Sequence, residues 1–539
     1  MSQDSEITTG EEQTLESGGV YEVIRKRLEQ QGGELRNEAN QLNEKRETEF
    51  GSSGMNVAGS ARVRTENNCV PRDIVSVGEY LLFGYNVFIG LRTETNVSDV
   101  FSLFKINEEA ADFELDHIPL QNTFLDDPDF KKDFQDLYQY YKTAHLVQLR
   151  RGIKGKLLAV FQVGTEQKDQ KVFRWSVSPE GEVEYIDNRG EHDNVIPPSH
   201  DFEWIQTTRD DHVRGTHSHI NILNEVFVET IGGDLTIKVE DNTEDGMGIY
   251  SEDVDDPNQS LQDAQIFYAR VGVLILLKIR PYKEKDWRYF IYNTRTEQVK
   301  RIDELGDACI QLPEDHGVIY PGGYYLQNGE SKTFDADVTD MYFLRKIVSP
   351  NGEDVFYVFY HYEDGRFILL SYNLIRKELE KPIVCNGYAL MDNGSMVIFK
   401  QQDQEATRVH PVQLWETQFT SDEYAASAPK NDSWYGKIGN ADLVRAISDV
   451  LGVCRTISNQ RPTIKGYEDL ISSITRIVDS YYWLDNPEAG TILKKLKNIS
   501  STSEQVLDEF EKVQAIRSEA QKALKEAQEK QKSIIRKTG

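Results

Sequence analysis

The first part of the chain alternates polar and apolar positions with a helical period. Apolar side chains recur at spacings of four, seven and seven residues, at Ile24, Leu28, Leu35 and Leu42. A stripe this narrow is typical of a coiled-coil seam, so it predicts an amphipathic helix over 19–50, hinged at Gly32-Gly33. Packing on the helix's own domain is the alternative. Residues 1–18 are acidic and rich in Ser, Thr and Gln, which predicts a disordered tail.

From about residue 60 to 425 the pattern changes to short runs rich in Val, Ile, Tyr, Phe and Trp, separated by Asn, Asp, Gly and Pro. Such runs predict β-strands joined by turns. Four segments share one plan, in which an aromatic-rich strand, a polar turn and an alternating strand follow one another: 99–118, 171–188, 286–304 and 366–384. Repetition at roughly 40–50 residues is the period of propeller blades.

This repeat predicts a mainly β fold. Over 60–425 we expect a divergent β-propeller-like body of roughly seven or eight blades, flanked by N-terminal and C-terminal coiled-coil-like helices. A pair of stacked β-sandwiches is the alternative, because the Gly-His and Trp-Asp blade signature is absent. One helix near 127–144 interrupts the strands, since Asp127 can cap it and Pro128 suits its first turn. We interpret this helix as an insertion between blades.

The C-terminal part of the chain is helical again. Residues 438–486 predict a small helical bundle. Over 491–539 apolar side chains recur at heptad-like spacings, at Val506, Phe510, Val513, Ala520, Leu524 and Ala527. This pattern predicts the start of a coiled coil, which the missing stop signal suggests is continued in a longer protein. We expect this helix and the N-terminal helix to pack against each other or against a second copy.

Charge narrows the choice of partners. The 539 residues carry 61 Lys and Arg against 90 Asp and Glu, a net charge of −29. An acidic body repels phosphate backbones, so we expect no strong nucleic-acid binding by the β body. Residues 491–539 carry 11 Lys and Arg against 7 Asp and Glu, a net charge of +4, and DNA binding by this segment is a third idea.

The sequence also indicates a reduced, soluble protein. Its four cysteines lie far apart, and none forms a C-x-x-C pair. No apolar run approaches the ~18 residues of a membrane span. The acidic N-terminus has no apolar core of a secretion signal. We therefore expect a cytoplasmic protein without a membrane span.

Common catalytic and nucleotide-binding motifs are absent from the chain. The phosphate-binding pattern G-x-x-x-x-G-K-[ST] does not occur, and the nearest stretch, 151–156, has the wrong spacing. G-x-S-x-G, H-E-x-x-H and G-x-G-x-x-G do not occur either. We therefore predict no catalytic residue, no cofactor and no tightly bound ATP in this chain.

Two segments contain residue types that ligate metal ions. One gathers His192, His200, Asp201, His212, His217 and His219. Two of these histidines, at i and i+2, would share one face of a strand. The other segment matches positions 1, 5, 6 and 12 of a calcium loop with Asp241, Asp245, Gly246 and Glu252. We favour backbone-bonded histidines and a solvated acidic turn, because each ligand set is incomplete and a strand precedes the acidic loop.

Three segments combine Arg, His, Asp and Asn: 64–73, 187–193 and 208–219. This composition predicts exposed loops, and propellers bind partners through the loops at one rim or in the funnel. The candidate rim comprises Arg72, Arg189, His192, Arg209 and His217. We expect these side chains to be more exposed than the core aromatics Trp175 and Trp287. A rim of mixed charge favours a protein partner over DNA.

Six long runs carry a resemblance to a known family: RTENNCVPRDIVSVGEYLLFGYNVFIGL (64–91), VFRWSVSPEGEVEYIDNRGEHD (172–193), PPSHDFEWIQTTRDDHV (197–213), VFVETIGGDLTIKVEDNTEDG (226–246), YPGGYYL (320–326) and SPNGEDV (349–355). They resemble the N-terminal region of very large bacterial proteins labelled DNA repair ATPases, over about 20–484. The resemblance implies that a long coiled coil and a C-terminal AAA+ ATPase module follow. ATP and Mg²⁺ would bind to that absent module, so no ATP-binding residue is carried over to this chain.

Two functions remain open at this point. The favoured hypothesis is a non-catalytic scaffold or regulatory part of a bacterial AAA+ ATPase. It would recognise a protein partner through the propeller-like platform and assemble through coiled-coil arms. The alternative is a metal-dependent hydrolase or nuclease with its site in the propeller funnel, built from the region 192–219. Stoichiometric bound transition metal would favour this alternative.

Overall fold

The computed structural model describes residues 19–52, 54–88, 94–107, 110, 112–152, 155–166, 168–335, 337–400, 405–427, 431–459 and 463–538. The disordered tail predicted at 1–18 lies outside these residues. The chain divides into two compact units. The helical unit comprises Met1–Ser52, Asn351–Glu353 and Pro429–Gly539, and the β unit comprises Ser53–Pro350 and Asp354–Ala428.

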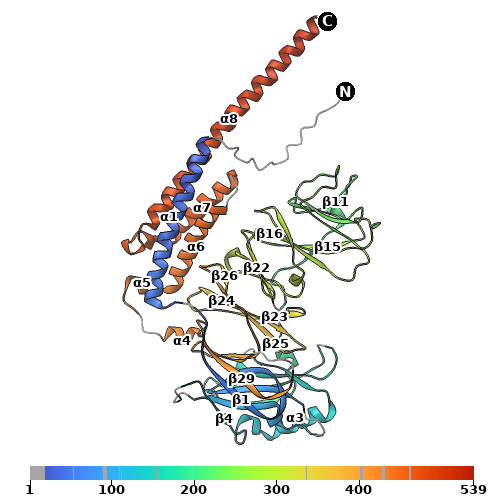
Figure 1. Ribbon diagram of the computed structural model, residues 1–539, viewed down its shortest axis with the longest axis vertical. Coiled ribbons are helices and arrows are strands. Elements are labelled where there is room, and N and C mark those ends of the chain that lie inside the picture. The colour runs from blue at the N-terminus through green and yellow to red at the C-terminus, as the bar shows by residue number, and fades with distance from the viewer. Residues whose placement is uncertain are drawn as a thin grey trace. The chain divides into compact units, whose positions relative to one another are not determined.

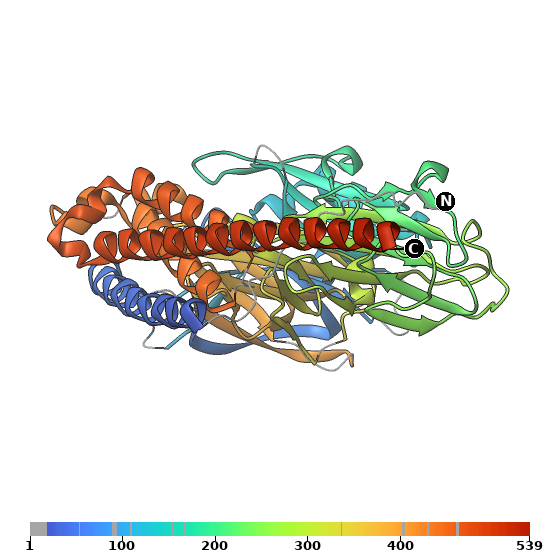
Figure 2. The same cartoon turned by 90° about the horizontal axis from the view of Figure 1, so that it is seen from above.

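Long helices dominate the helical unit: α1 (Gly19–Phe50), α6 (Asn440–Asn459), α7 (Ile464–Ser480) and α8 (Ile492–Thr538), with the short α5 (Trp434–Ile438) before α6. α1 packs against α6 and α8 (Figures 1 and 2). The hinge predicted at Gly32-Gly33 is wrong, because α1 is continuous through both glycines. A Cβ at Gly32 would lie 3.3 Å from Ile457 Cγ2 of α6, so this glycine allows close helix packing. Among the described residues, no helix is long and apolar enough to cross a membrane.

Polar contacts hold α1 antiparallel to the first half of α8. Lys495 Nζ lies 2.9 Å from Glu34 Oε2. The backbone N–H of Thr491 donates to Glu38 Oε2 over 3.1 Å. The two helices therefore pack together there, as the sequence predicted. α8 extends past the start of α1 (Figure 1), and its apolar stripe is exposed beyond that point, by 46, 67 and 61% at Val513, Ile516 and Leu524.

The described strands of the β unit form five antiparallel sheets. The largest contains β1 (Asn56–Val77), β2 (Tyr80–Val87), β3 (Phe101–Ile106), β4 (Leu115–Ile118), β23 (Met341–Val348), β24 (Asp354–His361), β25 (Arg366–Asn373), β26 (Glu378–Leu379), β27 (Ile383–Leu390), β28 (Ser395–Lys400) and β29 (Thr407–Glu416). Two sheets have four strands each: β5 (His145–Arg151), β6 (Leu157–Gln162), β7 (Gln170–Val177) and β8 (Val183–Asp187); then β19 (Ile310–Gln311), β20 (Gly317–Tyr320), β21 (Gly323–Leu326) and β22 (Ser331–Thr333).

Two further sheets have five strands each. The first contains β10 (His212–Val213), β11 (His219–Ile222), β12 (Val226–Glu229), β13 (Asp234–Lys238) and β14 (Tyr250–Asp253). The second contains β9 (Ile205–Gln206), β15 (Gln265–Val271), β16 (Leu274–Arg280), β17 (Arg288–Asn293) and β18 (Gln298–Arg301). Short helices complete the unit: α2 (Val97–Val100), α3 (Pro128–Tyr140) and α4 (Asp422–Ala426).

Strand β1 joins the two ends of the β unit. Residues 56–69 of β1 pair with β29, the last strand, and residues 69–77 pair with β2 (Figure 1). The long strand thus exchanges partners near Cys69. The sequence prediction of a loop at 64–73 is therefore wrong. Polar residues are tolerated in this stretch because pairing with β29 is interrupted between Arg64 and Cys69, and a bulge follows Pro71.

Four groups of strands follow one another in cyclic order, and we call them the four-group ring: β1–β4, β5–β8, β23–β26, and β27–β29 with the first half of β1. The last two groups are joined by the pairing of β25 with β27. The group β5–β8 is apolar on both faces. Phe161 and Trp175 pack on β2, β3 and α3, whereas Leu158 and Val160 pack on β24, β25 and β28. A further core between β2 and β28 closes the cycle.

The remaining three sheets stack in line on this ring. Sheet β19–β22 packs on β23–β25, sheet β15–β18 packs on β19–β21, and sheet β10–β14 packs on β15–β17. The described strands thus do not follow chain order around one ring, since β5–β8 contacts the β24–β28 region.

The prediction of a mainly β chain is confirmed, with 37% of residues in strands and 31% in helices. The four repeated segments form the hairpins β3–β4, β7–β8, β17–β18 and β25–β26. A closed propeller and a count of seven or eight blades are not confirmed for the described strands.

His410 lies fully buried in the core between β1 and β29. Its Nε2 is 3.2 Å from Cys69 Sγ and 3.3 Å from Thr65 Oγ1. Burial lowers the pKa of His410 to about 4 and raises the pKa of Cys69 to about 11. Both groups are therefore neutral at pH 7, and this Cys–His pair stabilises the core rather than supplying a thiolate nucleophile.

We expect stability to fall in acid because of His410. The pKa of His410 in the folded state lies below the unfolded value of about 6.5, so below that pH the unfolded state binds the proton more readily. The free energy of unfolding is therefore unaffected by this group above about pH 6.5 and falls as the pH falls toward 4. The loss should reach about 3 kcal/mol by pH 4, at about 1.4 kcal/mol per pH unit. Urea unfolding at several pH values measures it, and the slope should flatten in His410→Gln. An equally steep slope in that variant would assign the acid sensitivity to other groups.

Candidate functional site: an arginine-lined cavity

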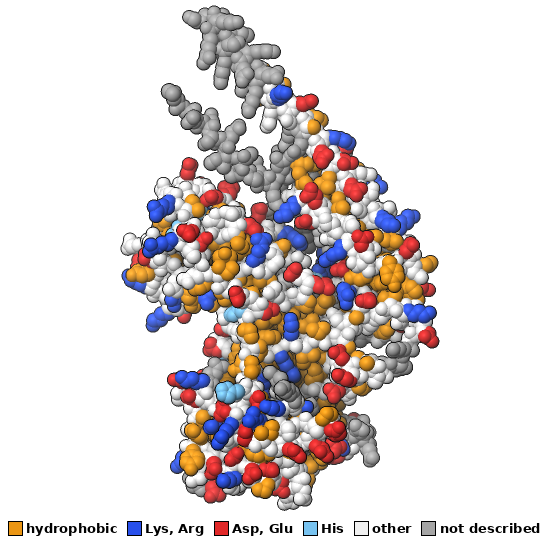
Figure 3. Space-filling model, turned by 180° about the vertical axis from the view of Figure 1, so that it is seen from behind, with side chains coloured by type: hydrophobic (Ala, Val, Ile, Leu, Met, Phe, Trp, Pro, Cys, Tyr) orange, Lys and Arg blue, Asp and Glu red, His pale blue; other side chains and the backbone are white. Residues whose placement is uncertain are grey.

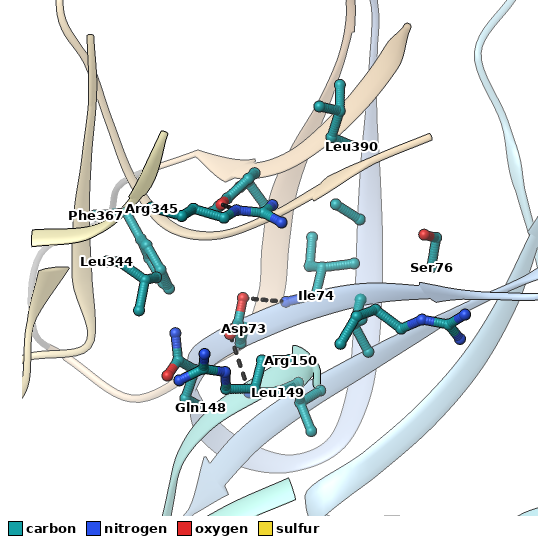
Figure 4. Close-up of a pocket in the computed structure, with 14 residues that line it drawn as sticks. Asp73, Ile74, Ser76, Gln148, Leu149, Arg150, Leu344, Arg345, Phe367 and Leu390 are labelled. Carbon is teal, nitrogen blue, oxygen red and sulfur yellow. Dashed lines mark hydrogen bonds between the residues drawn. The ribbon is translucent and has the colours of Figure 1, made fainter. Parts of the chain in front are cut away.

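A cavity of about 110 Å³ lies where the groups of the four-group ring meet (Figure 4). Its walls come from β1, β5, β23, β25 and β27. The polar lining consists of Asp73, Ser76, Gln148, Arg150, Arg151, Arg345 and Tyr388. Leucines, Phe367 and other apolar residues complete the walls. Residues distant in sequence thus converge on one small polar space.

Each first strand of the ring carries a β-bulge at the cavity. The register shifts fall between Pro71 and Asp73, Leu146 and Gln148, Phe343 and Arg345, and Cys385 and Tyr388. A bulge bends the strand and re-aims the next side chain. The four residues that follow the bulges, Asp73, Gln148, Arg345 and Tyr388, all line the cavity. The bulges therefore place the polar lining.

Asp73 connects the strands around the cavity. Its Oδ1 accepts the backbone N–H of Ile74 over 2.8 Å, and its Oδ2 accepts that of Leu149 on β5 over 3.0 Å (Figure 4). The side chain is only 2% exposed. Burial raises the pKa of this carboxyl well above its usual value, while the backbone donors and the charge of Arg345 oppose the rise. Asp73 is thus a structural acceptor shared by two groups of the ring.

Gly387 allows β27 to approach β1 closely beside Asp73. A Cβ on residue 387 would lie 2.5 Å from Asp73 Cα and 3.0 Å from the backbone nitrogen of Ile74. Any larger residue would force the two backbones apart. Glycine at this bulge therefore keeps the cavity closed on the side of Asp73.

Three arginines give the cavity its positive charge. Arg345 Nε donates to the Tyr388 hydroxyl over 2.6 Å. Arg150 donates to Asn194 Oδ1 over 3.1 Å and to the Val195 carbonyl over 3.0 Å. Burial lowers the pKa of Arg150, and the neighbouring charge of Arg345 lowers it further. Within the described part of the chain, none of Arg150, Arg151 and Arg345 forms an ion pair with a carboxylate. Arg150 is half-buried, and Arg151 and Arg345 reach solvent, so an ion from outside can approach them.

The five residues of the predicted rim do not line this cavity. Arg72 is half-buried beside it and donates to the Glu363 carbonyl over 2.9 Å in the turn between β24 and β25. Arg189, His192 and Arg209 are exposed, and His217 is half-buried. No hydrogen bond or ion pair joins any two of them within the described ranges. A shared binding rim therefore stays a prediction.

The prediction that the rim residues are more exposed than the two reference tryptophans is confirmed for one of them. Trp175 is fully buried, and all five rim residues are more exposed than it. Trp287 is half-buried, so it does not differ in class from Arg72 or His217.

Three histidines of the metal candidate, His200, His217 and His219, bind separate partners. His217 precedes strand β11 rather than sharing it with His219, which corrects the prediction of one strand face. His217 Nδ1 lies 2.8 Å from Glu229 Oε1, and His219 Nε2 lies 2.8 Å from Asp241 Oδ1. His200 is hydrogen-bonded to the Leu305 carbonyl. Among the described residues, no three His, Cys, Asp or Glu side chains are placed to hold one metal ion.

A lysine occupies the inside of the acidic loop. Lys238 Nζ donates to the carbonyl oxygens of Asp245 and Asn242 over 2.7 and 3.3 Å. The same ammonium lies 2.5 Å from Glu229 Oε2. Glu252, the twelfth position of the supposed calcium loop, instead pairs with Arg288 over 2.6 Å. The carbonyls that could face a cation are thus satisfied by the chain's own ammonium group.

Sequence reasoning missed the arginines of the cavity. The signal that could have found them is a charged residue inside an otherwise apolar strand, as in HLVQLRR (145–151) and MYFLRKIV (341–348). Such positions are buried unless they face a polar space.

The fold and the cavity define a mainly β chain with an electropositive pocket in an acidic body. The chain belongs to the DUF3686 family, described as "ATPase involved in DNA repair", which matches residues 34–482. No similar sequence is found among curated proteins.

Several solved structures are similar in part. A chain of the mitotic checkpoint complex is 8% identical and covers 68% of this chain and 94% of its own, with a TM-score of 0.24. The C-terminal WD40 domain of Sif2 is 9% identical, with 65 and 98% covered and a TM-score of 0.21. The β-propeller domain of the Trilobed protease from Pyrococcus furiosus is 10% identical, with 67 and 98% covered and a TM-score of 0.20. Scores this low carry no argument about arrangement or function.

Proposed function

We propose that this chain is a non-catalytic recognition and scaffold module of its family, which binds an acidic group of a protein partner in the arginine-lined cavity. The observation that carries the proposal is the set of three arginines without a carboxylate partner in the described residues of a chain with a net charge of −29. Asp73 also lines the cavity, but its oxygen atoms accept backbone N–H groups, so the guanidinium groups are available for an external acidic group.

The chemistry of the cavity suits a single carboxylate or phosphate group. Guanidinium groups bind such groups through paired, charge-assisted hydrogen bonds. A space of about 110 Å³ fits one such group rather than a polymer. The face drawn in Figure 3 shows acidic and basic side chains interspersed, with apolar ones between them. A protein partner therefore suits this chain better than a nucleic acid, whose many phosphates the acidic body repels.

The same residues argue against catalysis in the cavity. Its lining contains no histidine, cysteine or lysine. Both carboxylate oxygens of Asp73 accept backbone N–H groups, and the Tyr388 hydroxyl is held by Arg345. Among the described residues of the lining, no side chain is free to act as a general base. We do not favour the metal-dependent hydrolase or nuclease, since His200, His217 and His219 bind separate partners.

We propose that this module lies in the cytoplasm. We also propose that it is part of a longer bacterial protein, another part of which is an ATPase module. This chain would neither bind nor hydrolyse ATP, because its sequence has no phosphate-binding loop. The exposed stripe of α8 would pair with another helix in a coiled coil, in a second copy or a partner. We interpret the stacked strand groups as blades of an opened, propeller-like platform.

Calorimetric titration with two probes, glutarate and inorganic phosphate, tests the proposal. We expect saturable binding to the wild-type chain with a dissociation constant of about 1 mM, because a small ligand makes few contacts. Arg345→Gln should weaken it at least about tenfold, since it removes one charged donor. Lys346→Gln is the matched control, because it removes the same charge from the next residue, which does not line the cavity. Equal affinity in wild type and Arg345→Gln would refute the proposal.

A further inference from the structure

One face of the sheet β9–β15–β16–β17–β18 is only partly covered by its neighbour. At one end of this face, Leu276 and Ile291 pack into the core shared with β20 and β21. At the other end lies a cluster that we call the aromatic–cation patch: Trp204, Phe267, Lys278, Arg280, Trp287 and Tyr289. All of these except Tyr289 are half-buried, so the patch reaches solvent.

Aromatic rings surround the ammonium group of Lys278. Its Nζ lies 4.5 Å from the ring centroid of Trp287, 5.6 Å from Phe267, 5.9 Å from Tyr289 and 6.0 Å from Trp204. The guanidinium carbon of Arg280 lies 4.7 Å from the same Trp287 centroid. Cation–π attraction thus holds two positive charges side by side on one sheet face.

These two cations lack the counter-charges that their neighbours have. In the same sheet and its turns, Arg288 pairs with Glu284 and Glu252, Lys283 with Asp256, and Arg301 with Asp303. Within the described ranges, Lys278 has no hydrogen-bond acceptor or carboxylate partner, and Arg280 donates to the neutral amide oxygen of Gln265 over 2.6 Å. Burial lowers the pKa of Lys278, and the charge of Arg280 adds to this. An external carboxylate would stabilise the charged form of Lys278 and so offset both the burial and the repulsion by Arg280.

We infer that the aromatic–cation patch is a docking site for an acidic segment of a protein partner. Carboxylates of the segment pair with Lys278 and Arg280. An apolar side chain next to them packs on the half-buried rings of Trp204 and Phe267. The site shares no residue with the arginine-lined cavity, so it stands independently of the proposed function.

Charge and ring geometry favour a peptide over single-stranded nucleic acid. Nucleic-acid platforms stack bases on free aromatic faces. Here Trp287 already lies next to two cations, at 4.5 and 4.7 Å from its centroid. A chain of net charge −29 also repels a polymer with one phosphate per nucleotide more strongly than a short segment with a few carboxylates.

Fluorescence anisotropy with a labelled peptide, Glu-Glu-Phe-Glu-Glu-Leu, tests the inference. We expect saturable binding that weakens at least tenfold in the double variant Lys278→Met, Arg280→Gln. Methionine keeps the apolar stem of the lysine in the ring cluster, and Arg280→Gln alone should give a partial loss. The matched control is Lys283→Met, which removes an exposed, ion-paired charge from the same sheet and should stay within twofold of wild type.

Several results would overturn the inference: no saturable binding, equal binding by the double variant, an equal loss in Lys283→Met, or binding of a ten-residue oligothymidylate in place of the peptide. The cavity variant Arg345→Gln should leave peptide binding unchanged. If it abolishes that binding, the peptide occupies the cavity, and the aromatic–cation patch is not the docking site.

Discussion

Replacing Lys238 by methionine is expected to lower the free energy of unfolding by about 3–5 kcal/mol, the range for breaking a buried ion pair. Lys238 and Glu229 are 2 and 3% exposed and lie 2.5 Å apart. Without the ammonium, the Glu229 carboxylate keeps a single partner, His217. The carbonyls of Asn242 and Asp245 also lose their donor. Urea unfolding followed by fluorescence measures the loss.

A double variant separates the buried charge from the packing. Adding Glu229→Gln to Lys238→Met removes the buried carboxylate that has lost its ammonium partner. The double variant should therefore lose less free energy of unfolding than Lys238→Met alone. The exposed pair of Lys283 and Asp256 provides the control, because Lys283→Met should cost less than about 1 kcal/mol. If Lys238→Met costs no more than this control, the buried pair does not hold the acidic loop.

Replacing Asp73 by alanine should cost about 2–6 kcal/mol, since two buried N–H groups, of Ile74 and Leu149, lose their acceptor at about 1–3 kcal/mol each. The loss would loosen the contact between β1 and β5 at the cavity. Asp73→Asn retains one acceptor oxygen and carries no charge to bury, so it should cost less than half as much. Chemical denaturation of both variants measures the difference.

Similar stability of wild type and Asp73→Ala would contradict the role of Asp73 as a shared acceptor. A larger loss in Asp73→Asn than in Asp73→Ala would contradict it as well. In that case, the amide nitrogen would face a backbone donor, and the carboxylate charge itself would hold the strands.

The helical unit could be predicted from the sequence because its pattern is local. Leu28, Leu35 and Leu42 recur with a helical period, and all three are buried. The hairpins were also visible, since aromatic strands and polar turns follow each other within about twenty residues. The continuity of α1 was missed because the space at Gly32 depends on Ile457, a residue of another helix.

The order in which the sheets pack could not be predicted. β6 is buried at all six positions, so its sequence shows that both faces are covered without showing by which sheets. The cavity was missed for the same reason. Asp73, Gln148, Arg345 and Tyr388 come together only through four bulges, and a one-residue bulge leaves no periodic trace in a sequence.

Charge patterns misled where the partner is distant in sequence. Arg72 belongs to a stretch dense in turn-forming residues, yet it lies in a strand and binds the Glu363 carbonyl. The acidic loop matched four positions of a calcium loop, although we favoured a solvated turn. Lys238 precedes the matched positions, and nothing in the spacing shows that this lysine turns inward. Exposure was predicted well for Arg189 and Arg209, which carry no such long-range contact within the described residues.

The central claim is that the arginine-lined cavity binds an anionic group, and a crystal structure of the chain with glutarate tests it most directly. The account predicts electron density for a carboxylate inside the cavity, with oxygen atoms about 2.7–2.9 Å from guanidinium nitrogens of Arg150 or Arg345, the distance of charge-assisted hydrogen bonds. The same crystals of Arg345→Gln should lack that density. A cavity without glutarate in the wild-type chain, at concentrations that saturate the calorimetric signal, would contradict the account.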